Sequence, residues 1–441
     1  MKRLLIIFPL LGILSSCGIY GTYSRDAAGI APQDSPSVES EPLSWRSVFT
    51  DAPLQALIDT ALRHNTDLQT ALLRTAEARA TLRSAKLSFL PSAGLTAGAA
   101  SSSDWDPSAG AEASWQIDLF GRKLNASRKA AASVEESEAY EKAVRTEVIA
   151  SVAEAYYTLL TLDAQLAISE QTLLNWDKTI GVLESLKLAG KTNDIAILQA
   201  KAKKLNLESS SLSLKGSIAM ARNALCTLMG VPPREIVRSS PETAPVPEVP
   251  RDGVSMAALL SRPDVKQAEA ALKQAFYGTQ AARADFFPDL TLSGTLGWTS
   301  AAGVITDPAA WIASAAASIA APLFRQGLRR AELEIAESRQ EQARLQYVQT
   351  LLEAGNEVND ALISCQTAQD RMEIDTRQRT GLGEAVEKIE LMMRYSTTNY
   401  LEVLTAQQSF LDAEIKVVED RLALIRGSIS LFRAMGVFST D

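Results

Sequence analysis

The chain contains few side chains of the kinds that enzymes and metal sites use. It has a single histidine, His64, and three cysteines among its 441 residues. Cys226 and Cys365 lie in apolar, helix-like stretches, where a free cysteine usually behaves as a small buried hydrophobe. The chain therefore offers few side chains for metal ligation or for histidine-based acid–base catalysis. The sequence predicts no enzyme, no metal site and no cofactor.

The third cysteine, Cys17, lies in a context that predicts covalent modification. Two basic residues precede an apolar run over 4–14, which continues into "LSSCG" at 14–18. These features are typical of an export signal, and the run is too short to cross a bilayer as a helix. The stretch resembles the lipobox of bacterial lipoproteins. That resemblance implies removal of residues 1–16, acylation of Cys17 and, because Gly18 follows, delivery to the outer membrane. The alternative is an ordinary signal peptide with an incidental cysteine.

The composition argues against nucleic acid as a partner and in favour of long helices. The formal net charge is −8, with 44 Lys and Arg against 52 Asp and Glu. A nucleic-acid-binding chain carries a basic patch, which this balance does not indicate. Hydrophobic residues make up 46% of the chain but aromatic residues only 6%. Together with abundant Ala, Leu, Ser, Glu and Gln, this favours long helices.

The sequence repeats itself in order, which indicates an internal duplication. The paired stretches are "FLPSAGLTAG" (89–98) with "FPDLTLSG" (287–294), 113–131 with 317–336, "TNDIAILQAKA" (192–202) with "TNYLEVLTAQQ" (398–408), and "LMGV" (228–231) with "AMGV" (434–437). Chance similarity between helix-rich segments gives one such match more readily than four in the same order. Internal repeats of this kind define the architecture before any local pattern does.

We therefore expect two repeats with one organisation, each containing helices, a β-hairpin and a pair of long helices. Repeat one covers 46–231 and repeat two covers 254–441. The Pro-rich stretch 232–253 is expected to act as a linker between them. The polar residues 17–45 are expected to form an extended arm that follows the signal peptide 1–16.

Each repeat contains a predicted β-hairpin, at about 89–119 and about 287–321. Along the second strand of repeat one, the apolar residues Ala111, Ala113, Trp115, Ile117 and Leu119 alternate with Glu112, Ser114, Gln116 and Asp118. Alternation of apolar and polar residues over about ten positions matches the pattern and length of a tilted transmembrane β-strand. The turn-rich stretches 101–110 and 300–309 are expected to join the strands.

Two hairpins give four strands, and four strands cannot close a barrel alone. An open sheet edge in lipid leaves unpaired backbone amides that cost several kcal/mol each. Either the strands form a soluble sheet, or several chains pool their strands into one barrel.

A very long helical pattern follows each hairpin. From 122 to 188 there is no proline and Gly181 is the only glycine, while apolar residues recur at spacings of four and three. Sustained spacing of this kind indicates coiled-coil packing. At 1.5 Å per residue, such a helix reaches on the order of 100 Å. Turns at 188–194 and 394–400 are expected to lead into returning helices.

The chain resembles the TolC-like outer-membrane efflux proteins, in particular the lipidated branch (NodT/OprM-like) of tripartite systems. The features that carry the resemblance are "LSSCG", the twin "FLP" and "FFP" strand starts, "DLFG" (118–121) and "RYSTTNYLEVLTAQQSFLDAE" (394–414). The likeness covers essentially the whole mature chain. No single motif is decisive, but their order and duplication are specific.

The resemblance implies a mainly α fold with transmembrane β structure. The internally duplicated protomer would give four β-strands and long coiled-coil helices, and a homotrimer would form a twelve-stranded β-barrel and an α-helical barrel. The implied function is a passive conduit across the periplasm, anchored in outer-membrane lipid, that exports small toxic molecules such as drugs or metals. Its implied partners are a periplasmic adaptor protein and an inner-membrane pump of the RND type.

The resemblance also places the narrow end of the conduit at the two helix turns. The residues expected at this tip are Gly190, Asn193, Asp194, Thr398 and Asn399. Glu402 matches a carboxylate that rings the closed pore in the family, although a solvated residue at a helix start is the alternative. The family's second acidic position is Thr405 here, which makes a double acidic ring doubtful. Tyr395 matches a tyrosine that ties the closed state together, but Ala196 replaces its acidic partner.

Three tryptophans of the predicted strands, Trp115, Trp298 and Trp311, are candidates for anchors at the membrane interface. Ordinary packing of a large ring is the alternative.

Two other functions remain open. A periplasmic coiled-coil scaffold lipoprotein would have no use for membrane-length hairpins, and a channel for type I protein secretion would export polypeptides instead of small molecules.

Overall fold

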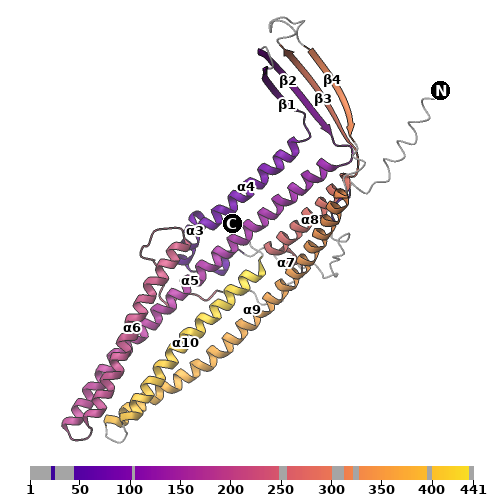
Figure 1. The fold of residues 1–441 in the computed structure, drawn as a ribbon. Helices are drawn as coiled ribbons and strands as arrows, with labels where there is room; N and C mark the ends of the chain where they lie inside the picture. Colours follow the sequence, from indigo (N-terminus) through magenta and orange to yellow (C-terminus); the bar gives the residue numbers. More distant parts are fainter. Residues whose placement is uncertain are drawn as a thin grey trace. The chain divides into compact units, whose positions relative to one another are not determined.

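The computed structural model describes residues 21–24, 44–101, 105–247, 256–299, 312–320, 327–394 and 400–436. Within these ranges the chain is mainly helical, with a few strands (Figure 1). The fold class predicted for the protomer, with four strands and long helices, is confirmed. Five of the predicted site residues lie outside the described ranges: Cys17, Trp311, Tyr395, Thr398 and Asn399.

Among the described residues, the same order of helices, hairpin and two long helices occurs twice along the chain, except that three helices precede the first hairpin and two precede the second. The first series is α2 (Trp45–Val48), α3 (Ala52–His64), α4 (Thr66–Leu87), β1 (Ser92–Ser101), β2 (Trp105–Ile117), α5 (Arg122–Leu188) and α6 (Asp194–Leu228). The second is α7 (Met256–Ser261), α8 (Pro263–Ala284), β3 (Asp289–Thr299), β4 (Ile312–Ala320), α9 (Leu328–Arg394) and α10 (Tyr400–Met435). Helices α5 and α9 both have 67 residues, and α4 and α8 both have 22. Matching lengths at matching places are what a duplicated unit leaves behind.

The described residues fall into two compact units. The sheet unit lies within the ranges 1–34, 72–140 and 264–350, and the helical unit lies within 35–71, 141–263 and 351–441. The long helices α5 and α9 each contribute residues to both units.

The sheet unit contains one antiparallel sheet with the strand order β1-β2-β3-β4. Each hairpin pairs with itself, and β2 pairs with β3, which joins the two repeats. Strand β2 begins at Trp105, so the turn expected over 101–110 is shorter than the sequence indicated. Pro107 lies opposite Ala99 of β1, while the β2–β3 pairing begins only at Ser108. A proline is tolerated there because its missing N–H removes no ladder bond from a central position.

The helical unit contains two antiparallel helical hairpins. Hairpin one consists of α5 and α6, which are linked by ion pairs such as Lys201–Glu184 at 2.9 Å. Hairpin two consists of α9 and α10, which are linked by Lys416–Asp375 at 2.9 Å. A large apolar core joins the two hairpins to α2 and α3 and includes the edge-to-face ring pair Phe49–Phe432. Packing of these faces, more than helix propensity, stabilises helices of this length.

The described part of the predicted linker is tied to the helices. Arg238 donates to both carboxylate oxygens of Asp163 in α5, at 2.5 and 2.9 Å. Arg421 of α10 donates to the carbonyl oxygens of Pro241 and Ala244 at 2.8 and 2.6 Å. The two bonds from Arg421 satisfy backbone carbonyl groups of a segment that forms no helix or strand of its own. The segment 232–247 is therefore part of the helical unit.

Candidate functional site

The sheet has one apolar face and one polar face across all four strands. Leu95 lies opposite Ala111, which lies opposite Leu296 on the next strand. Residues directly opposite one another point to the same side, and every second residue along a strand shares that side. The apolar face carries Ala93, Leu95, Ala97, Ala109, Ala111, Ala113, Trp115, Ile117, Leu290, Leu292, Leu296, Trp298, Ala313, Ala315 and Ala317. The polar face carries Ser92, Thr96, Ser108, Glu112, Ser114, Gln116, Thr291, Ser293, Thr295, Ser314 and Ser318, with glycines between them.

The two outer strands of the sheet are open. Among the described residues, β1 pairs only with β2 and β4 pairs only with β3. Each outer strand therefore presents a row of backbone N–H and C=O groups that have no strand partner in the part of the chain that the structure describes. Such an edge needs either water or another strand beside it.

The two described tryptophans of the sheet differ in their surroundings. Trp115 is 40% exposed, and its indole Nε1 donates to the carbonyl oxygen of Phe89 at 2.8 Å. Trp298 is only 8% exposed. Both rings lie on the apolar face. The role of interface anchor suits Trp115 better, because its polar atom is held at the end of the hairpin while its ring is exposed.

The "DLFG" stretch fixes the step from strand β2 to helix α5. A carboxylate oxygen of Asp118 accepts the backbone N–H of Leu124 at 2.8 Å, in the first turn of α5, where N–H groups lack helical partners. Gly121 has φ +75°, a conformation that favours glycine. Lys123 donates to the carbonyl oxygens of Ser88 and Gln116 at 2.6 and 2.9 Å. These contacts hold the first hairpin to the start of α5.

The turn between α5 and α6 is tightly specified by its own residues. Gly190 has φ +73°, and its N–H donates to the carbonyl oxygen of Lys187 at 2.9 Å. The N–H of Lys191 donates to the carbonyl oxygen of Leu186 at 2.9 Å, which completes a Schellman ending. Asn193 caps α6 by accepting the N–H of Ala196. Lys187 also pairs with Asp194 at 2.5 Å, with both side chains exposed. The structure thus places Gly190, Asn193 and Asp194 together in one turn.

An apolar cluster lies beside the turns and joins all four long helices. We call it the turn-end cluster, and its buried members are Trp176, Ile180, Leu183, Ala196, Ile197, Ala200, Leu207, Met393, Val403, Leu404 and Leu411. Ala196 is fully buried within it. An acidic side chain at this position would be desolvated, which gives a physical reason for alanine here.

The other gate candidates lie on the surface of α10. Glu402 is exposed in the first turn of the helix. Thr405 is also exposed, and its hydroxyl donates to the carbonyl oxygen of Leu401 at 2.8 Å. Glu402 occupies the position in repeat two that Ala196 occupies in repeat one, by the spacing that relates 228–231 to 434–437. Equivalent positions therefore carry a buried alanine and an exposed carboxylate.

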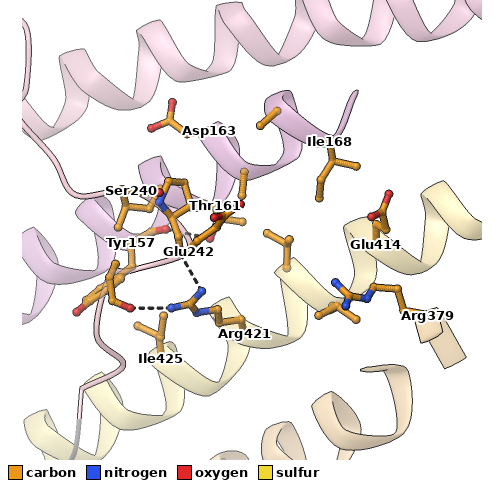
Figure 2. Close-up of a pocket in the computed structure, with 17 residues that line it drawn as sticks. Tyr157, Thr161, Asp163, Ile168, Ser240, Glu242, Arg379, Glu414, Arg421 and Ile425 are labelled. Atoms are coloured by element: carbon orange, nitrogen blue, oxygen red, sulfur yellow. Dashed lines mark hydrogen bonds between the residues drawn. The ribbon is translucent and has the colours of Figure 1, made fainter. Parts of the chain in front are cut away.

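Sequence reasoning missed a pocket between α5, α10 and the tied segment (Figure 2). Its volume is about 460 Å³. Arg421 closes one end through its bonds to the segment, while Glu414 and Arg379 line the other. Burial raises the pKa of Glu414, and the nearby charge of Arg379 opposes that rise. No local pattern could have revealed this pocket, because its walls come from four distant parts of the chain.

Two further searches cover the same described ranges. No group of three or more His, Cys, Asp or Glu side chains there is arranged to hold a metal ion. None of the helices in those ranges combines the length and the apolar character that a membrane crossing requires.

Comparison with known proteins identifies the family. The model of the family described as "Outer membrane efflux protein" matches residues 57–231 and 254–437, which is most of the chain and follows the two repeats. The chain belongs to the outer membrane efflux protein family. The resemblance drawn from its motifs is thereby confirmed, and the chain is an outer-membrane protein.

Individual relatives cover nearly the full length of the chain. The cation efflux system protein CusC of Escherichia coli (strain K12) is 30% identical over 447 residues, which cover 96% of each chain. The probable outer membrane lipoprotein SilC of Salmonella typhimurium is 29% identical over 462 residues, which cover 99% of this chain and 98% of SilC.

Solved structures of family members have the same fold. A CusC structure, from work on folding and transmembrane channel formation, matches with a TM-score of 0.83 at 29% identity and covers 92% of this chain and 99% of CusC. The open state of the MtrE outer membrane channel of Neisseria gonorrhoeae matches with a TM-score of 0.82 at 26% identity, covering 92% and 97%. An efflux channel of the outer membrane is therefore the function that family and fold support.

Proposed function

We propose that three copies of this chain form one continuous conduit through the outer membrane and across the periplasm. The observation that carries the proposal is the sheet with an apolar face, a polar face and two open edges. In lipid, every backbone polar group must find a partner within protein. Edge-to-edge pairing of β1 and β4 from neighbouring copies would close the sheets into a barrel, with the apolar face toward lipid and the polar face toward the lumen.

The native mass of the protein extracted from the outer-membrane fraction tests this assembly. We expect a trimer-sized species. Replacing Ala315, near the middle of the apolar face on β4, with Arg should reduce the trimer in the membrane, because a charge on the lipid face costs roughly 2–4 kcal/mol at the midplane. The matched control is Ser314→Arg, which points to the opposite face. A monomer in the soluble periplasmic fraction would contradict the barrel and favour a scaffold lipoprotein.

The proposed cargo is small toxic molecules, either metal ions or drugs. The support is the names of the relatives, which include a cation efflux protein and a toluene efflux pump outer membrane protein of Pseudomonas putida. A periplasmic adaptor and an inner-membrane pump of the RND type would supply selection and energy. Deletion of the gene should sensitise cells to the pump's substrates and leave the secretion of polypeptides unchanged. Loss of a secreted protein instead would favour the type I secretion alternative.

We further propose Glu402 as a charged ring at the narrow end. Three symmetric carboxylates close together would attract cations into the pore. Glu402→Gln should therefore lower the preference for K⁺ over Cl⁻, measured as the reversal potential across a planar bilayer in a KCl gradient. Thr405→Val, one turn further along α10, is the control and should leave the reversal potential unchanged. An unchanged potential in Glu402→Gln would leave Glu402 as a solvated helix-start residue.

Acylation of Cys17 is proposed from the lipobox alone. Incorporation of a labelled palmitate analogue, lost in Cys17→Ser, would establish it. A protein that is cleaved but unlabelled would indicate an ordinary signal peptide.

A further inference from the structure

The pocket of Figure 2 has the size and the walls of a small-molecule site. All of its lining residues belong to the helical unit, and its volume of about 460 Å³ falls in the range of sites for drug-sized ligands. The apolar side chains that α5 and α10 contribute to it include Leu160, Ala164, Ile168, Val417 and Val418. A ligand with an apolar body would therefore bury that body against two helices.

Several polar groups of the pocket already have partners within the chain. The guanidinium of Arg421 donates to two backbone carbonyl oxygens of the segment 232–247. The hydroxyl of Tyr157 donates to the carbonyl oxygen of Pro245 at 2.8 Å, and Asp163 accepts from Arg238. These contacts fasten the segment to the helices, so their groups hold the walls of the pocket in place.

Glu414 of α10 is a half-buried charged group of the pocket that has no such partner. In the ranges that the structure describes, its carboxylate makes no hydrogen bond and no ion pair. Arg379 of α9 and Glu242 also line the pocket, but both are exposed. Burial raises the pKa of Glu414 although the charge of Arg379 opposes that rise. The carboxylate has thus lost part of its hydration, and no donor within the described chain replaces it.

The equivalent carboxylate of repeat one does have a cation beside it. Glu208 corresponds to Glu414 by the spacing that relates 228–231 to 434–437. It pairs at 3.6 Å with Lys204, which lies one turn earlier on α6. The position that corresponds to Lys204 in repeat two carries Phe410. Repeat two therefore keeps the carboxylate and lacks the lysine, so an amine supplied from outside the chain could take the place of the lysine ammonium group.

We propose that this pocket binds a small organic cation, whose ammonium group donates to the carboxylate of Glu414 while its apolar body lies against α5 and α10. A hydrogen bond between two charged groups is roughly twice as strong as one between neutral groups. The bound cation would stabilise the folded helical unit by mass action. The site is contained in that unit and does not depend on closure of the proposed barrel.

Two other classes of ligand fit the pocket less well. A metal ion needs several ligands, and across the described ranges no group of three His, Cys, Asp or Glu side chains is arranged to supply them. An anion would need a free buried cation. Arg421 is already bonded to backbone carbonyl oxygens, and Arg379 is exposed to water.

The test is isothermal titration calorimetry of the full-length protein in a non-ionic detergent at pH 7.5, with 4-phenylbutylamine as the probe. We expect saturable binding at one site per chain. Glu414→Gln keeps the size of the side chain and removes its charge, and it should weaken the affinity at least about tenfold, which corresponds to about 1.4 kcal/mol. Glu208→Gln, at the equivalent place in repeat one, is the matched control and should bind the amine as the wild type does.

Two further measurements separate the site from partition of the probe into detergent. Ala164→Phe fills part of the apolar wall and should abolish binding at amine concentrations that saturate the wild type. The carboxylate 4-phenylbutyrate has the same apolar body and the opposite charge, and it should bind at least about tenfold more weakly than the amine, by the same charge-dependent contribution. Partition into detergent would not change with either substitution.

Each outcome supports or overturns the site. Equal affinity of the amine for the wild type and for Glu414→Gln would overturn it, and so would tighter binding of the carboxylate or no binding by the folded wild type. If Ala164→Phe fails to fold, the comparison of Glu414→Gln with Glu208→Gln still decides. A monomeric protein that binds the amine as expected would contradict the proposed conduit and leave this site standing.

Discussion

The two repeats end their returning helices in the same way but fill the junction with different side chains. Gly230 after α6 has φ +67°, and Gly436 after α10 has φ +60°. In repeat one, the amide of Asn65 donates to the carbonyl oxygen of Leu228 at 2.8 Å. In repeat two, the guanidinium of Arg262 donates to the carbonyl oxygen of Ala434 at 2.5 Å.

The longer side chain in repeat two does more than replace the shorter one. Arg262 is 4% exposed and also pairs with Glu357 of α9 at 2.6 Å. Asn65 instead uses its oxygen to accept the N–H of Leu68 at 3.0 Å, which caps α4. The comparison teaches that the backbone arrangement is what the two repeats share. The side chains that satisfy it have diverged, and each now has a second task in its own repeat.

The largest difference between the repeats is expected for alanine at the two glycines. A Cβ at Gly230 would lie 2.3 Å from the backbone oxygen of His64, whereas one at Gly436 would lie 2.8 Å from the side-chain Cγ of Arg262. A side chain can move aside more easily than backbone. Gly230→Ala should destabilise the protein by at least about 3 kcal/mol, and Gly436→Ala by about 1–2 kcal/mol. Denaturant unfolding in detergent, followed by circular dichroism, measures both. Equal losses would show that the two junctions are equally tight.

Substitutions of the side chains that fill the junctions, Arg262 and Asn65, should have the next largest effects on stability. Arg262→Met removes a buried donor and leaves the carbonyl of Ala434 without it, so we expect a loss of about 3 kcal/mol. Asn65→Ala loses a helix cap and one hydrogen bond, together about 2 kcal/mol. The same unfolding assay compares them. Arg262→Lys should recover part of the loss. A smaller effect at Arg262 than at Asn65 would contradict the wider role assigned to the arginine.

Substitutions at the two equivalent gate positions, 196 and 402, should also differ in their effects on stability. Ala196→Asp places a charge inside the turn-end cluster and should destabilise the protein by roughly 2 kcal/mol at neutral pH. Glu402→Ala, at the exposed equivalent, should change stability by less than about 0.5 kcal/mol. Thermal unfolding of the two variants at pH 7.5 measures both changes in stability. If both substitutions are neutral, the burial of position 196 has no energetic consequence.

The smallest effect is expected for the pH dependence of stability that Glu414 causes. Burial raises the pKa of Glu414, so its ionised form is less stable in the folded protein than in the unfolded chain. Its unfavourable contribution is absent at low pH and grows as pH rises from the unfolded to the folded pKa. Glu414→Gln should therefore raise the Tm at pH 7.5 and leave it nearly unchanged at pH 3.5. Glu208, its counterpart in repeat one, pairs with Lys204 at 3.6 Å, so Glu208→Gln removes an ion pair and should not raise the Tm at pH 7.5.

Much of the fold could be predicted because its signals are local. The absence of proline from 122 to 188 gives a helix whose observed bounds are Arg122–Leu188. Alternation along 111–117 assigns the faces of β2 correctly, and the register then extends those faces across the sheet. The turn at Gly190 and Asn193 was also accessible, because each residue type has a specific conformational use there.

The rest depends on pairs of residues far apart in the chain. Nothing in the local sequence of β2 or β3 says that they pair with each other and join the repeats. Pro-rich composition indicated a linker over 232–253. The bonds that tie its first part to the helices, from Arg238 to Asp163 and from Arg421 to Pro241, arise only in the folded unit and could not be read from the sequence. The bond that the amide of Gln407 in α10 donates to the hydroxyl of Thr179 in α5 was missed for the same reason, since the two residues lie on different hairpins.

The polar face of the sheet is built mainly from glycine, serine and threonine, with Ala316 among them and with Glu112, Gln116 and Asp289 as its larger members. Such a wall has short hydroxyls and bare backbone but few aromatic rings, clefts or fixed charges that could grip one particular solute. If this face lines the proposed barrel, the passage would discriminate little between solutes, and the choice of cargo would fall to the proposed pump. The same exit would then serve a different pump without any change in its own residues.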